Sequence, residues 1–250
     1  MRDLNFKNSF GGGGTLSRLS GAKKSGAFTL AEVLITLGII GVVAAIIMPS
    51  AIASYQKKVT VRKLHQAYNF LKQAEQLAIA EYGDEQTWDC LATVNLCSGA
   101  QFASKYIVPY FKGTYVVSKR SLTQLGYKNY PKTLNGERTL TAHKDFIFTK
   151  QGYLYMLDPY TTIDNTRTFY MLYIDINGKS GPNILGKDIF RLTYGYNGSA
   201  SKHYRLQMFN WSNLSREQLL SSSCNKNNTG EYCGAVIETD GWEIKDDYPW

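Results

Sequence analysis

The four cysteines of this 250-residue chain are close enough in pairs to form disulfides or to bind a metal. They form two close pairs, Cys90 with Cys97 and Cys224 with Cys233, and six and eight residues lie between the partners. Structural zinc sites usually place about two to four residues between paired ligands, so zinc binding by these sulfurs is disfavoured. Two local disulfides formed in an oxidising compartment are the better interpretation. Four free thiols in a reducing compartment are the alternative.

Catalytic motifs are missing from the sequence. The three histidines, His65, His143 and His203, stand apart from one another and from any nucleophile at a readable triad spacing. No GxSxG, HExxH, Walker loop or GxGxxG occurs in the chain. The sequence therefore favours a protein that enzymes modify over one that is itself an enzyme.

Glu32 is the one strongly polar residue in the 21-residue segment from Phe28 to Met48. A helix of this length spans about 30 Å, which is the thickness of the hydrocarbon core of a bilayer. A carboxylate near the end of a membrane helix is costly unless its charge finds a partner. Alternatively, the Glu32 side chain has no partner and extends to the cytoplasmic interface of the membrane, where water solvates its charge.

Positive charge is concentrated before this segment. Residues 1–27 carry five basic residues and one acidic residue, which is half of the formal net charge of +8. Lys23 and Lys24 place the N-terminus on the cytoplasmic side by the positive-inside rule, although Lys57 and Lys58 weaken that assignment. The rest of the chain is mildly basic and has no basic run interleaved with aromatics, so no nucleic-acid partner is expected.

The residues after Met48 predict a second, amphipathic helical half. Pro49 removes one backbone donor and should kink the helix without ending it, and Gly83 should stop it. Together the two halves predict one rod of roughly 55 residues. Apolar residues recur at three- and four-residue steps at Ile52, Tyr55, Val59, Leu64, Tyr68, Leu71, Ala74, Ala78 and Tyr82.

The remaining pattern predicts an exported globular head over residues 84–250, after a leader (1–27), an apolar helix (28–48) and an amphipathic helix (49–83). Short helices are expected over Phe102–Phe111 and Leu214–Ser222, and Asn177-Gly178 is a turn signal. The fold class is α+β, with the long N-terminal helix packed on an antiparallel sheet. Strands are expected at 115–117, 146–148, 153–157, 169–176, 189–194 and 204–209.

The run SGAFTLAEVLITLGIIGVVAA resembles the prepilin cleavage and methylation motif of type IV pilins and type II secretion pseudopilins. That motif places a small residue at the end of a basic leader, before a Phe-Thr-Leu-x-Glu start. If Phe28 is the first mature residue, Glu32 is the fifth and Pro49 the twenty-second, as in this family. Ala27 stands where the family most often has glycine. Cleavage after Ala27 keeps Glu32 and Pro49 in register, and cleavage after Gly26 is the alternative.

The resemblance implies a filament subunit. A prepilin peptidase and methylase would process it, membrane lipid would hold it, and a membrane assembly platform would join it to other subunits through the N-terminal helix. The partner of Glu32 would be the N-terminal amine of a neighbouring subunit. The implied location is the bacterial cytoplasmic membrane, single-pass with the head exported, and then a filament in the periplasm or at the cell surface.

Several alternatives stay open. The chain could be a single-span anchored binding protein or enzyme, or a minor pilin that binds DNA or a surface ligand. The sequence is compatible with a subunit of a pilus or of a secretion pseudopilus, and with a place in the filament shaft or at its tip.

Oxygen donors gather between Asp175 and Asp188, in a loop similar to one in many pilin-like heads. Asp175, Asn177 and Asp188 are the ligands that a structural calcium would require. An EF-hand needs glycine at its sixth position, where this loop has Ser180. A turn held by Asx hydrogen bonds explains the composition without a cofactor and is preferred. The Cys224/Cys233 pair is similar to the disulfide-bounded C-terminal region of pilins.

Overall fold

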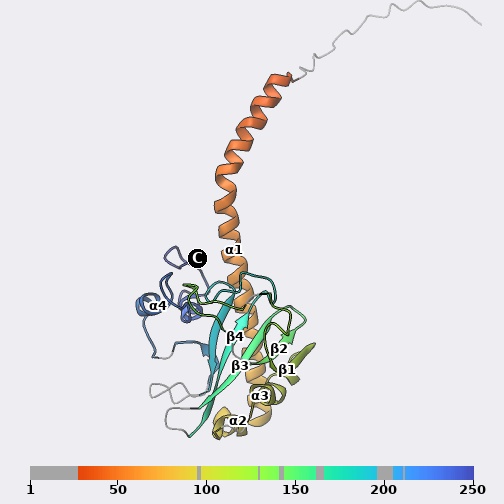
Figure 1. Cartoon of the computed structure of the whole chain (residues 1–250), viewed down its shortest axis with the longest axis vertical. Coiled ribbons are helices and arrows are strands. Elements are labelled where there is room, and N and C mark those ends of the chain that lie inside the picture. The colour runs from red at the N-terminus through yellow and green to blue at the C-terminus, as the bar shows by residue number, and fades with distance from the viewer. Residues whose placement is uncertain are drawn as a thin grey trace, which may run out of the picture. The chain divides into compact units, whose positions relative to one another are not determined.

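The computed structural model describes residues 28–94, 97–128, 130–140, 144–161, 166–195, 205–210 and 212–250. The chain divides into two compact units, the first ending at Pro49 and the second running from Ser50 to Trp250. Helix α1 (Leu30–Tyr82) contributes its first turns to the first unit and its remainder to the second (Figure 1). The leader, including Gly26 and Ala27, lies outside the described residues.

The first part of α1 is apolar on every side. Among the described residues, α1 is the one helix that is long and apolar enough to cross a membrane. Its large apolar side chains, such as Ile35, Ile40 and Ile46, are mostly exposed to more than half of their area. A helix that is hydrophobic all round requires an apolar environment, either a lipid bilayer or the interior of an assembly.

The second part of α1 packs on the head through one face. The buried apolar residues follow three- and four-residue steps, as the sequence predicts, but they begin only at Val61. Ile52 and Tyr55, which the pattern placed on the buried face, are 49% and 68% exposed. The periodicity shows which face of the helix is apolar, but it does not show at which residue the contact with the head begins. The buried apolar set is Val61, Leu64, Ala67, Tyr68, Leu71, Ala74 and Ala78.

Gly83 ends α1, as predicted. It adopts a φ of 79° and its N–H binds the carbonyl of Ile79 at 2.9 Å, which is a left-handed cap that glycine adopts without strain. Short elements follow: η1 (Glu85–Thr87), α2 (Asp89–Ala92), α3 (Gly99–Tyr106) and η2 (Val108–Tyr110). The helix expected over 102–111 therefore begins earlier and ends at Tyr106. Pro109 explains the break, because it has no N–H with which to continue the helix.

Six antiparallel strands pair in chain order, β1-β2-β3-β4-β5-β6. Each of the six strands predicted from sequence overlaps an observed strand: the one at 189–194 has the predicted bounds, and the other five differ at one or both ends. Tyr204, the predicted start of the last strand, lies outside the described residues. The predicted α+β class is confirmed. Tyr155 in β3 donates its hydroxyl to the carbonyl of Ala67 at 3.0 Å, and this hydrogen bond joins the sheet to α1. The strands are β1 (Thr114–Arg120), β2 (Lys144–Thr149), β3 (Leu154–Thr161), β4 (Thr168–Asp175), β5 (Ile189–Tyr194) and β6 (Gln207–Met208).

Two short helices close the chain. Helix α4 (Arg216–Ser222) matches the predicted one, whereas α5 (Cys233–Thr239) was not predicted. The α5 segment is short, contains Gly234 and has no side-chain N-cap, so no start signal marks it. Arg216 binds Asp240 at 2.5 Å and Asp247 at 2.7 Å, which fastens the C-terminal tail to α4.

A buried carboxylate pair lies between α1 and the sheet. Glu75 and Glu85 are 3% and 6% exposed. Glu75 accepts hydrogen bonds from Lys72 and from the backbone N–H of Leu206, and Glu85 accepts one from the hydroxyl of Tyr194 at 2.7 Å. Burial, together with the charge of Glu75, raises the pKa of Glu85 to about 8. In the folded head the protonated form of Glu85 therefore predominates up to a pH of about 8.

This raised pKa predicts a loss of stability in alkali. The protonated group stabilises the fold fully below its ordinary value of 4.5, and this contribution is lost as the pH rises through about 8. Glu85→Gln resembles the protonated side chain, so it should raise the Tm by several degrees above about pH 8 and change it little near pH 4.5. Thermal unfolding of the full chain in micelles measures this, with the exposed Glu243→Gln as the control. An equal effect of Glu85→Gln at both pH values would contradict it.

Candidate functional site

The start of α1 is organised by Thr29 and Glu32. The Glu32 carboxylate accepts hydrogen bonds from the backbone N–H and the hydroxyl of Thr29, at 2.9 and 3.0 Å. The backbone N–H of Glu32 donates in return to the Thr29 hydroxyl at 3.2 Å. These three bonds form a capping box, which satisfies backbone donors that the first turn of a helix leaves unpaired.

The capping box is a role of Glu32 that the sequence analysis did not assign. The signal was available, because Thr-Leu-Ala-Glu before an apolar run is a capping-box sequence. The geometry turns the carboxylate toward the N-terminal end of the helix, where the backbone dipole favours negative charge. Phe28, one residue before Thr29, is 85% exposed. The carboxylate thus lies beside the predicted new N-terminus.

Pro49 lies inside α1, which continues past it to Tyr82. This is the behaviour predicted for a proline that removes one donor without ending the helix. Glu32 and Pro49 therefore share one helix, and Phe28 lies two residues before its start. The other two residues of the predicted cleavage site, Gly26 and Ala27, lie outside the described residues.

Most of the chain, residues 50–250, matches the model of a family of unknown function, DUF6613. The chain belongs to the DUF6613 family. In this family member, residues 22–48 also match the prokaryotic N-terminal methylation motif. No curated protein and no solved structure matches the chain.

The methylation-motif match covers the segment that carries Phe28 and Glu32. Together with the long apolar helix and the six-stranded sheet, it supports a type IV pilin-like prepilin. The resemblance seen in the sequence is thereby confirmed. The DUF6613 match covers the head and adds no function.

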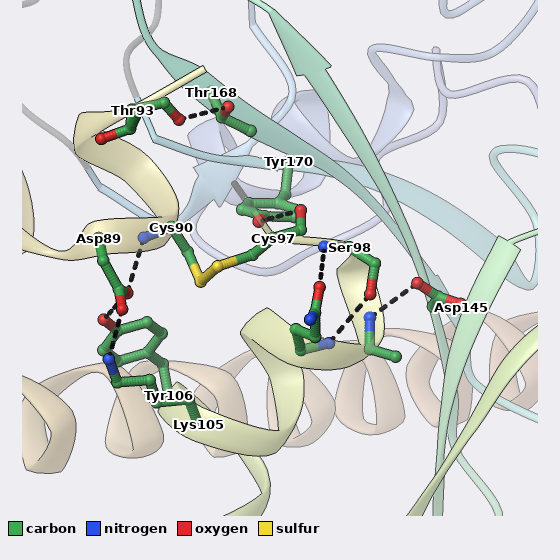
Figure 2. Close-up of a disulfide and its surroundings, with 12 residues drawn as sticks. Asp89, Cys90, Thr93, Cys97, Ser98, Lys105, Tyr106, Asp145, Thr168 and Tyr170 are labelled. Carbon is green, nitrogen blue, oxygen red and sulfur yellow. Dashed lines mark hydrogen bonds and ion pairs between the residues drawn. A yellow bond between two sulfur atoms is a disulfide. The ribbon is translucent and has the colours of Figure 1, made fainter. Parts of the chain in front are cut away.

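The first disulfide of this DUF6613 head joins Cys90 and Cys97, whose Cα atoms are 5.1 Å apart (Figure 2). It closes the link between α2 and α3. Tyr170 of β4 donates its hydroxyl to the carbonyl of Cys97 at 3.1 Å. The hydroxyl of Thr168, on the same strand, donates to the carbonyl of Thr93 at 2.9 Å. The disulfide therefore holds a segment that is also fixed to the sheet by β4.

Asp89 lies beside this disulfide, and Asp89, Cys90 and Cys97 place potential metal-ligand atoms within 4.8 Å of one another. The two sulfurs are bonded to each other, so neither is available as a thiolate ligand. Asp89 instead accepts hydrogen bonds from Lys105 at 2.7 Å and Tyr106 at 2.6 Å (Figure 2). These bonds lower the pKa of Asp89 and keep it ionised. This cluster is structural.

The second disulfide joins Cys224 and Cys233, with Cα atoms 4.8 Å apart. It covers Gly186, where an added Cβ would lie 2.9 Å from the sulfur of Cys233. Gly186 has a φ of 86°, and its carbonyl accepts the hydroxyl of the buried Tyr248 at 2.5 Å. Glycine is thus required by both the backbone conformation and the close approach of the disulfide.

The predicted metal ligands Asp175, Asn177 and Asp188 come together in the loop between β4 and β5. The Asp188 carboxylate accepts the backbone N–H groups of Ile184 at 2.6 Å and Asn183 at 2.7 Å. It also accepts the side-chain amide of Asn177 at 3.1 Å. Asp188 thus holds the loop in a tight turn.

Asp175 makes a similar set of bonds at the start of the loop. Its carboxylate accepts the hydroxyl of Tyr127 at 2.7 Å and the backbone N–H of Asn177 at 3.1 Å. Burial, together with the charge of Asp188, raises the pKa of Asp175 to about 7 despite these hydrogen bonds. Burial also raises the pKa of Asp188.

These contacts are the ones required by the Asx-turn interpretation. N–H and O–H donors already face the oxygens of both carboxylates, and they stand where a cation would have to approach. The buried side-chain oxygens of Asn177 and Asn183 accept no hydrogen bond from the described residues. The contacts satisfy the carboxylates as a hydrogen-bonded turn would, but they leave these two buried amide oxygens as the kind of ligand that calcium takes. Calcium binding stays a prediction from the sequence.

Replacing Asp188 by asparagine should distinguish the two interpretations. The substitution puts an amide opposite the N–H groups of Asn183 and Ile184, and each lost charged hydrogen bond costs about 1.5–3 kcal/mol. We expect a Tm several degrees lower, and we expect calcium or a chelator to leave the wild-type Tm unchanged. Thermal unfolding of the full chain measures both. A calcium-dependent rise in the Tm that Asp188→Asn abolishes would establish a metal site.

Proposed function

We infer that this chain is a structural subunit of a type IV pilus-like or type II secretion pseudopilus filament. The observation that carries the inference is the position of Glu32, at the capped start of a helix that is apolar on every side, within the matched methylation motif. In an anchor alone this carboxylate would only cap the helix, a role that does not require its charge to be buried. A subunit that packs its helix among others gains a means of setting register.

Glu32 would set that register by pairing with the N-terminal amine of a neighbouring subunit. In the core of an assembly, removing one partner leaves the other charge buried and unpaired, which is strongly unfavourable. One spacing of the helices along the filament is then preferred over others. The exposed apolar side chains of the first part of α1 supply the area that such packing would bury.

The head would lie outside the cytoplasm. Both cysteine pairs are disulfides, and disulfides persist in oxidising compartments. The N-terminus would face the cytoplasm, where a prepilin peptidase and methylase acts on the leader junction. The subunit would be held by membrane lipid as a single-pass protein until an assembly platform adds it to other subunits. The proposed role is structural, not enzymatic.

Processing gives the first test. We expect cleavage between Ala27 and Phe28 and methylation of the new amine, because this cut places Glu32 fifth and Pro49 twenty-second. N-terminal analysis and intact mass of the chain from a host with a prepilin peptidase measure it. A mature chain that begins at Met1, or beyond Met48, would be inconsistent with this function, whereas one that begins at Ala27 would correct the site.

Glu32 gives the second test, through two substitutions that separate its charge from its capping role. Glu32→Val removes both the charge and the acceptor for Thr29, whereas Glu32→Gln removes the charge and keeps an acceptor. We expect both variants to insert and be cleaved normally but to enter filaments poorly. Co-expression with wild-type chains, followed by comparison of membrane and sheared-filament fractions, measures incorporation.

Thr36→Val is the matched control, because it removes a polar side chain from the same segment without removing a charge. It should enter filaments normally. Normal incorporation of Glu32→Gln with poor incorporation of Glu32→Val would reduce the role of Glu32 to helix capping. Equal incorporation of all chains would favour a plain membrane-anchored protein.

A further inference from the structure

Charge is separated along the part of α1 that belongs to the second unit. The chain has no acidic residue from Ser50 to Ala74. From Glu75 to Asp89 the balance is opposite, with five acidic residues and no basic one. Such a separation gives this unit a cationic and an anionic surface at two places along one helix. We call the four basic residues of the first stretch that lie within 57–63 the basic end: Lys57, Lys58, Arg62 and Lys63.

Two of the five acidic residues are available to a partner. Glu75 and Asp89 each bind a lysine of the same chain, and Glu85 is buried. The other two, Glu81 and Asp84, are exposed and form no ion pair within the described residues. We call Glu81 and Asp84 the acidic end.

The basic end is also without an ion pair in the part of the chain that the structure describes. Three of its cations, Lys58, Arg62 and Lys63, are exposed. Glu243 and Asp246 line the groove that Lys58 and Arg62 also line, and they offset part of the positive charge. Four cations near two carboxylates leave the basic end with an excess of positive charge.

Each end also carries exposed apolar side chains. Ile52 and Tyr55 precede the basic end on α1 and are exposed. Leu77 and Tyr82 lie beside the acidic end and are 51% and 39% exposed. Both surfaces therefore combine unpaired charge with apolar area that a partner would cover.

The two ends are too far apart to neutralise each other within one chain. Glu81 is 18 residues past Lys63 on the same helix, a rise of about 27 Å. A lysine side chain and a glutamate side chain together do not span this distance. Contact between the basic end and the acidic end therefore requires two copies of the chain.

We propose that the acidic end of one copy docks on the basic end of a second copy. The carboxylates of Glu81 and Asp84 pair with the cations of the basic end, and the exposed apolar side chains of both ends are covered together. The two surfaces differ and lie at separate places on each copy, so the contact is heterologous and repeats in one direction along a row of copies. Pairing of two basic ends, or of two acidic ends, is disfavoured by like charges.

This contact rests on the proposed function and deepens it. Exposed ion pairs are individually weak, so the contact forms where the copies are already held together at high local concentration. Packing of the apolar helices in a filament would supply that concentration. The contact would then fix how one head sits against the next, which Glu32 alone does not determine.

Cross-linking of the wild-type chain gives the first test. A carbodiimide joins a lysine amine to a carboxylate that touches it and adds no spacer. We expect mass spectrometry of digested filaments and membranes to find Lys57, Lys58 or Lys63 joined to Glu81 or Asp84. Such a link must connect two copies, because the helix keeps these residues apart within one chain. Absence of these links from both fractions would overturn the proposal.

Charge reversal gives the second test, measured as the yield of sheared filaments. A variant with either end reversed brings like charges together, so its yield should fall about tenfold or more when it is expressed alone. Co-expression of the two variants restores opposite charges between unlike chains, so filaments that contain both should return. The basic-end variant is Lys58→Glu, Arg62→Glu and Lys63→Glu, and the acidic-end variant is Glu81→Lys and Asp84→Lys.

The matched control reverses three exposed lysines elsewhere on the head, Lys112→Glu, Lys128→Glu and Lys226→Glu, and should assemble as wild type does. Normal assembly of either end variant alone would overturn the proposal, as would failure of the co-expressed pair when both chains unfold thermally as wild type does. If a variant does not fold, the cross-links of the wild-type chain decide the question.

Failure of this contact is distinguishable from failure of the proposed function. Wild-type filaments that lack the cross-links would refute the contact and leave the filament role intact. Cross-links in membranes of cells whose assembly machinery makes no filaments from this chain would support the contact and refute the filament role.

Discussion

Close packing between α1 and the aromatic face of the sheet is the contact on which the rest of the head depends. Three alanines of α1, Ala67, Ala74 and Ala78, are at most 1% exposed and belong to the core that the helix shares with the strands. Tyr155 lies in the same core and donates its hydroxyl to the carbonyl of Ala67. A larger residue at any of the three alanines would overpack this core.

The loop between β4 and β5 connects this core to the C-terminal region. Asp188 holds the loop in shape, Gly186 lies under the Cys224–Cys233 disulfide, and Tyr248 binds the carbonyl of Gly186. The backbone N–H of Lys132 also binds the carbonyl of Asn183 at 2.9 Å. Segments far apart in the sequence thus meet at this turn. The donors to Asp188 come from the turn itself, whereas Asp175 also receives one from a distant segment, the hydroxyl of Tyr127.

The sequence allowed much of the fold to be predicted, because strong local signals agree with it. Three local signals predict elements that the structure contains. The apolar run predicts the first part of α1, Gly83 predicts its end, and the β-rich apolar runs predict the strands. It did not reveal which part of the amphipathic stripe is covered, so Ile52 and Tyr55 were misplaced. The burial of Glu75 depends on Leu206, 131 residues away, and no local pattern reports such a contact. The capping role of Glu32 can be predicted from the sequence, because Thr29 and Glu32 have the spacing of a capping box.

The chain-order pairing of the six strands bears on how the head folds. Each strand pairs with the next one in sequence, so the sheet can grow by local steps with modest loop-closure entropy. The contact of Tyr155 with Ala67 spans 88 residues and closes a much longer loop. Since α1 precedes the sheet in the chain, it has been synthesised before any of the strands. The head is therefore suited to fold progressively onto a helix that is made before it, with few unpaired strands exposed at any moment.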